Sequence, residues 1–136
     1  MANYEVRPEY FYTRGDTWVH RSDAGEIRFG ITDFAQKKLR EIEYLSLPDC
    51  GDNVEQSCSL GEVESKKAVS ELISPISGTV ERVNEAAVDE PKLLNSAPYD
   101  EGWILTLHCS DYEEQTAKLM DAGAYQKFLE EKEQKK

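Results

Sequence analysis

The stretch "GEVESKKAVSELISPISG", residues 61–78, places Lys66 and Lys67 between two segments rich in strand-forming residues. One segment, "SLGEVE", precedes the lysines and the other, "AVSELIS", follows them. Residues 65–68, where the two segments meet, have the length of a tight turn, so the pattern predicts a β-hairpin with both lysines at its tip. Two interpretations of the pair remain open. The charges can simply keep a turn hydrated, or one lysine can be an attachment point.

The overall composition indicates one folded domain, residues 1–136, with an acidic surface. The chain has 16 basic and 27 acidic side chains, which gives a net charge of −11. A negative net charge of this size repels phosphate backbones, so we expect no nucleic-acid partner. It favours instead docking to positively charged surfaces on other proteins.

We expect no membrane segment and a cytoplasmic location, because no apolar run has membrane-spanning length and "MANYEVRPEY" lacks an apolar secretory core. Cys50, Cys58 and Cys109 form no C-x-x-C pair and cannot all pair with one another. Unpaired thiols in a reducing compartment are the favoured interpretation. A metal site that combines them with His20 and His108 has no support from the spacing.

The first half of the chain predicts further strands and one short helix. Residues 17–31 contain two alternating segments around a turn at "SDAG", and the second segment is expected to have one buried and one exposed face. Thr32 or Asp33 can cap the helix that follows. The apolar positions of that helix are expected to be Ala35, Leu39 and Ile42.

The second half continues in the same way and ends in helix. "GTVERVN" predicts a strand, and residues 85–102 predict a long connection with a turn of helix. Residues 103–109 alternate cleanly, with Trp103, Leu105, Leu107 and Cys109 on one side. Ser110 and Glu113 have the spacing of a capping box at the start of the C-terminal helix. We expect residues 130–136 to fray, and the fold class to be mainly β with short helices.

The sequence around the lysines, "VESKKA…SPISGTV", resembles the lipoyl-attachment hairpin, in which the modified lysine precedes an alanine. This resemblance implies that Lys67 carries lipoate. The residues that would frame it for the attaching enzyme are Glu64, Ser65, Lys66 and Ala68. Biotin carriers use a related hairpin, but their lysine typically lies between methionines, so lipoate fits better than biotin.

The resemblance extends over most of residues 10–130. "GITDFAQKKL", "LSLPDCGDNV", "LLNSAPYDEGWI" and "LMDAGAYQKFL" are similar, in order, to the glycine-cleavage H-protein family. The family implies a lipoyl/biotinyl-type hybrid barrel-sandwich of small antiparallel sheets with a C-terminal helix. It also implies a carrier without catalytic activity. The sequence agrees, since it has no P-loop, no G-x-S-x-G motif and no Cys/His pair at catalytic spacing.

Some positions depart from the family pattern. Family members usually read "HEW" where this chain has "DTW", so Asp16 replaces a histidine and Thr17 replaces an acidic residue near the parked lipoyl arm. Glu71 keeps the acidic character expected of the other wall of that cleft. Two more departures are Lys66, where a small apolar residue is common, and Arg40, where the family usually has glycine.

Without the acidic residue at position 17, a cationic aminomethyl cargo has less support. We therefore favour the paralogous lipoate-binding protein of a heterodisulfide-reductase-like sulfur-oxidation system. The alternative is a glycine cleavage H protein that serves glycine decarboxylase, aminomethyltransferase and dihydrolipoyl dehydrogenase. Both interpretations require a lipoate-attaching enzyme as a partner.

Overall fold

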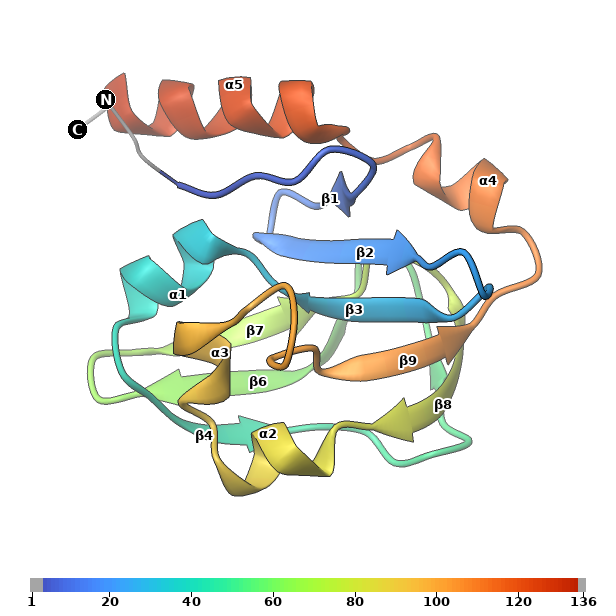
Figure 1. Ribbon diagram of the computed structural model, residues 1–136, viewed down its shortest axis with the longest axis horizontal. Coiled ribbons are helices and arrows are strands. Elements are labelled where there is room, and N and C mark those ends of the chain that lie inside the picture. Colours follow the sequence, from blue (N-terminus) through green and yellow to red (C-terminus); the bar gives the residue numbers. More distant parts are fainter. Residues whose placement is uncertain (1–3, 135–136) are drawn as a thin grey trace.

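Two antiparallel sheets form the body of the protein in the computed structural model, which describes residues 4–134 (Figure 1). The larger sheet has the strand order β1-β2-β3-β9-β8-β5, and the smaller has the order β4-β6-β7. The strands of the larger sheet are β1 (Phe11–Tyr12), β2 (Thr17–Arg21), β3 (Ile27–Ile31), β9 (Leu105–His108), β8 (Gly78–Val83) and β5 (Asn53–Val54). Those of the smaller sheet are β4 (Ile42–Ser46), β6 (Ser59–Ser65) and β7 (Val69–Ile73).

In the described part of the chain, five helices connect or cover these sheets. They are α1 (Asp33–Leu39), α2 (Glu85–Asp89), α3 (Leu93–Ser96), α4 (Tyr112–Thr116) and α5 (Ala122–Gln134). The predicted class, mainly antiparallel β with short helices and a C-terminal helix, is confirmed. Within the described residues each sheet keeps two edge strands, so the sheets do not close into a barrel. No helix of this part of the chain is long and apolar enough to cross a membrane.

The apolar faces of the two sheets form the main core. Alternating side chains of β3 lie in it, as predicted, together with residues of the smaller sheet such as Val63 and Leu72. The prediction that the other face of β3 would be exposed is wrong at Gly30. The indole of Trp18 packs against this glycine, and any side chain there would overlap the ring. A side chain at position 30 is therefore excluded by packing.

A second apolar cluster covers that outer face. It consists of aromatic and aliphatic side chains from the N-terminal strands, α1, the loop after α3 and α5, namely Tyr12, Trp18, Phe34, Tyr99, Tyr125 and Leu129. Figure 1 shows α5 lying across the β1–β2 end of the larger sheet. The hydroxyl of Tyr125 hydrogen-bonds to Thr32 and to the buried carboxylate of Asp16, at 2.8 and 3.0 Å. Burial raises the pKa of Tyr125, so this phenol stays protonated.

The helix α1 begins as the sequence predicts but ends earlier. Thr32 does cap α1, since its hydroxyl accepts a hydrogen bond from the Ala35 amide at 3.2 Å. However, α1 ends at Leu39, and Ile42 is the first residue of β4 rather than part of the helix. Arg40 causes the change of direction, because its φ of 69° lies outside the helical region.

The C-terminal part also differs in detail. Asp111, not Ser110, precedes α4, and no side chain caps that helix, so the predicted capping box does not form. The strand β9 begins only at Leu105, and Thr106 is as buried as its neighbours because both faces of this strand are covered. The last helix runs to Gln134, which takes in most of the segment 130–136 that we expected to fray. Residues 135–136 lie outside the described residues.

Candidate functional site: the hairpin tip

Strands β6 and β7 form a hairpin within the smaller sheet, and its register brings Glu64 opposite Val69 next to the turn. In the sequence, Leu60 and Val63 fall out of phase around Gly61, which predicts a bulge there, and a register shift between Ser59 and Gly61 confirms it. Gly61 is required there, because a side chain would overlap the backbone carbonyl of Ser46 on β4. The bulge therefore fixes the base of the hairpin against its neighbour.

The turn itself is organised by one buried hydroxyl. The Oγ atom of Ser65 accepts hydrogen bonds from the backbone amides of Lys67 and Ala68, each at 3.1 Å. The backbone amide of Ser65 in turn donates to the carbonyl of Ala68 at 2.9 Å. Ser65 is only 6% exposed, so these bonds are shielded from water. These hydrogen bonds define the backbone conformation of the tip.

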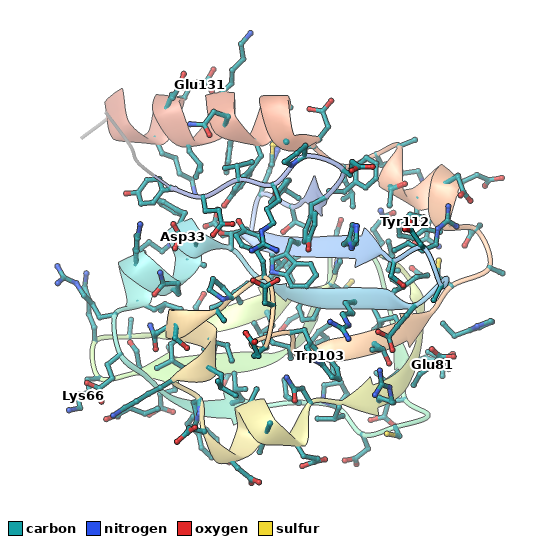
Figure 2. All side chains as sticks on the ribbon, viewed as in Figure 1. Asp33, Lys66, Glu81, Trp103, Tyr112 and Glu131 are labelled. Atoms are coloured by element: carbon teal, nitrogen blue, oxygen red, sulfur yellow. The ribbon has the colours of Figure 1, made fainter. Side chains whose placement is uncertain are left out.

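The two lysines at the tip have different surroundings. The ammonium of Lys66 lies 3.9 Å from carboxylate oxygens of both Glu41 and Glu43, which draws it toward β4. Lys67 is exposed, and within residues 4–134 its amine has no ion-pair partner. Figure 2 shows Lys66 at one extreme of the molecule, at the opposite end from Tyr112. Of the two amines, that of Lys67 is the one left available to another protein.

The remaining recognition residues predicted around Lys67 lie on the outer surface of the hairpin. Glu64 and Ala68 are exposed, one at the end of β6 and the other in the turn. Glu71 is exposed on β7 and lies opposite Glu62 of β6, so the two carboxylates share the outer face of the smaller sheet. This face is acidic from the turn to the middle of the hairpin.

Thr17 does not line an open cleft, in contrast to the prediction. Its side chain is 1% exposed, and its hydroxyl donates a hydrogen bond to the Ile73 carbonyl at 2.7 Å. A second short bond, of 2.6 Å, joins it to the hydroxyl of Thr13. The residue therefore fastens the edge of β7 to the N-terminal strands. Its identity is explained by this structural role and says little about a cargo.

The cysteines and histidines do not assemble into a site. Cys50 and Cys58 are exposed, Cys109 is partly buried, and none of the three forms a disulfide within the described chain. No group of three or more His, Cys, Asp or Glu side chains in that part of the molecule is arranged to hold a metal ion. His20 stacks on Tyr10 with ring centroids 4.2 Å apart, which is a packing role.

A family model described as "Glycine cleavage H-protein" matches residues 10–132 of this chain. The chain belongs to the glycine cleavage H-protein family. The glycine cleavage system H protein of Anaeromyxobacter sp. (strain K) is 48% identical over 129 residues, which cover 95% of this chain and 99% of that protein. The mitochondrial glycine cleavage system H protein 2 of Arabidopsis thaliana is 46% identical over 124 residues, which cover 91% of this chain and 78% of that protein.

Among solved structures, the crystal structure of a glycine cleavage system H protein from Mycobacterium marinum superposes with a TM-score of 0.78 at 34% identity. The match covers 88% of this chain and 95% of that one. Membership of the glycine cleavage H-protein family makes the chain a carrier and not an enzyme. The sulfur-oxidation interpretation, which the sequence departures led us to favour, is not supported, and the glycine cleavage alternative fits better. The main argument for sulfur oxidation was the missing carboxylate at position 17. The structural role of Thr17 weakens that argument.

Proposed function

We propose that the chain is the lipoyl carrier of a glycine cleavage system and that Lys67 is its attachment site. The observation that carries the proposal is the hydrogen-bonded turn, in which the exposed amine of Lys67 stands without an ion-pair partner among the described residues. Attachment forms an amide with this amine, so the amine has to enter another protein's active site. An exposed side chain in a hairpin turn can do so without local unfolding.

The chain's own residues supply a hydrogen-bonded base for a mobile arm. Ser65 orders the backbone of the turn, and the ammonium of Lys66 lies near the carboxylates of Glu41 and Glu43 beside β4. When attached, the lipoyl group supplies a reducible disulfide on which a one-carbon cargo is carried between active sites. A tether of this kind raises the effective concentration of the cargo at each partner.

The proposed partners are a lipoate-attaching enzyme, glycine decarboxylase, aminomethyltransferase and dihydrolipoyl dehydrogenase. The recognition frame proposed for the attaching enzyme is Glu64, Ser65, Lys66 and Ala68, with Lys67 at its centre. Glu71 is proposed to lie along the path of the arm, because it is exposed on the same hairpin. The cytoplasmic location stays a prediction from the sequence.

The exchange of glycine carboxyl carbon with bicarbonate tests this function. The protein is first treated with lipoate and a lipoate ligase, and the exchange is then measured with glycine decarboxylase. We expect exchange with the wild type and with Lys66→Arg, and none with Lys67→Arg. A lipoylated wild type that gives no exchange would contradict the pathway, and full exchange by Lys67→Arg would contradict the site.

A further inference from the structure

A cleft of about 470 Å³ opens beside the hairpin tip and is lined mainly by basic side chains. These come from the C-terminal end of α1, the hairpin turn and α5, and two aromatic rings complete the lining. The lining residues are Lys37, Lys38, Arg40, Lys67, Lys132, Tyr4 and Phe34. Five of the chain's 16 basic residues thus meet in one cleft, although the net charge of the protein is −11. Figure 1 shows α1, the β6–β7 turn and the C-terminal end of α5 on the same side of the fold.

Two of the cations lie close to the aromatic ring of Phe34. The ammonium groups of Lys38 and Lys132 lie 5.5 and 5.0 Å from the ring centroid of Phe34, within the range of cation–π attraction. The same two ammoniums lie 3.8 and 3.4 Å from one carboxylate oxygen of Asp16, which is 4% exposed. A second carboxylate, that of Asp33, pairs with Lys37 at 3.0 Å. Two carboxylates thus face the five cations of the lining, and the cleft keeps a positive excess.

Arg40 stands at the rim in a backbone conformation that suits glycine. Its φ and ψ of 69° and −146° lie close to a region that non-glycine residues rarely occupy. The backbone there is well satisfied, because the side-chain amide of Asn95 donates to the Arg40 carbonyl at 2.7 Å. The guanidinium is exposed and makes no ion pair within residues 4–134. The chain thus retains a strained residue where its side chain contributes charge to the cleft.

We propose that this cleft is a docking surface for a carboxylate-rich surface of the enzyme that attaches lipoate to Lys67. The inference rests on the proposed function, since it requires an enzyme that acts on this amine. Any such enzyme has to cover the cleft, because Lys67 is itself part of its lining. The partner meets positive charge on this side and the carboxylates of Glu62 and Glu71 on the outer face of the hairpin. This opposition of charge sets the orientation in which the two proteins meet.

A protein surface suits the cleft better than a small anion does. The side chains of Lys37 and Lys38 are 49% and 53% exposed, so their charges act on an approaching surface and are not desolvated around a small ligand. Charges of this kind mainly raise the association rate and its dependence on salt. Attachment also converts the Lys67 amine into a neutral amide, which weakens the attraction for the product.

The test compares two double variants of the unmodified protein that lose equal charge. Lys37→Gln/Arg40→Gln removes two cations from the cleft, while Lys118→Gln/Lys127→Gln removes two exposed lysines outside it. The kcat/KM of lipoylation is measured at low and at physiological salt, and thermal unfolding verifies that each variant is folded. We expect the cleft variant to lose about tenfold in kcat/KM at low salt with kcat unchanged. The loss should shrink at higher salt, and the control should stay within about twofold of the wild type.

Equal losses in the two variants, or no loss in the cleft variant, would overturn the docking inference. Inorganic phosphate serves as a probe for a small-anion site. If phosphate shifts the amide resonances around Arg40 while the lipoylation rates of wild type and cleft variant agree, the cleft binds a small anion and the inference is wrong. A wild type that gains no lipoyl group refutes the proposed function instead, so the two failures are distinguishable.

Discussion

Replacing Arg40 by glycine should stabilise the protein, which is the opposite of what glycine usually does. The φ of 69° at this position imposes a backbone strain of about 1–3 kcal/mol on a residue with a Cβ atom. Glycine relieves that strain but adds about 0.4–1 kcal/mol of conformational entropy to the unfolded chain. The hydrogen bonds of residue 40 are made by its backbone, to Gln36 and from Asn95, so they survive the change. The net expectation is a gain of about 1 kcal/mol in the free energy of unfolding.

Urea unfolding of Arg40→Gly, with Arg40→Ala as the matched control, measures this gain. The alanine variant loses the same exposed side chain but keeps the Cβ atom, so it should stay within about 0.5 kcal/mol of the wild type. For a chain of this size a gain of about 1 kcal/mol corresponds to a rise in Tm of about 3 °C. A glycine variant that is no more stable than the alanine variant would refute the strain argument, and with it the view that Arg40 is kept for its charge.

Three further changes test other parts of the account. Ser65→Ala removes the acceptor for two backbone amides, so it should cost about 1–2 kcal/mol of stability and slow lipoylation. Ser65→Thr should keep most of the stability and most of the lipoylation rate. Equal lipoylation rates in the alanine variant and the wild type would argue against a turn-ordering role. Gly61→Ala should cost about 2–3 kcal/mol in urea unfolding because its Cβ atom meets the Ser46 carbonyl, and a neutral result would mean that the bulge can shift. Burial lowers the pKa of His20, so the unfolded chain binds this proton more readily, and the stability that the neutral ring contributes is lost as the pH falls below about 6.5. The wild type should therefore lose more stability than His20→Gln between pH 7 and 5, and parallel pH profiles would contradict that assignment.

The features that could be predicted from the sequence depend on local signals. The hairpin, its bulge and its tip follow from residue types within a few positions of Lys67, and the cap at Thr32 follows from one side chain and one amide. The position of Ile42 could not be predicted in the same way. Its spacing continues the apolar stripe of the helix, but the conformation of Arg40 ends the helix before it. The side chain of Ile42 is buried whether the residue belongs to a helix or to a strand, so hydrophobic spacing alone does not distinguish the two structures.

Packing between distant segments accounts for the other differences. Gly30 is buried because the ring of Trp18 packs against it, within the apolar cluster that also includes residues of α5. The alternation of residues within β3 does not reveal this covering layer. The basic cleft was missed for a similar reason, since Lys132 joins the lysines of α1 only in the folded chain. One local signal was available, because the run "QKKLR" is unusually basic for so acidic a sequence.

The position of the lipoyl group tests the central claim most directly. Lys66 and Lys67 are adjacent, so fragment-ion mass spectrometry of the peptide that contains both, after treatment with lipoate and a lipoate ligase, separates the two sites within one molecule. We expect the mass of one lipoyl group on Lys67 and an unmodified Lys66. A lipoyl group on Lys66, or a hairpin that stays unmodified when a known lipoyl protein in the same reaction is labelled, would contradict it.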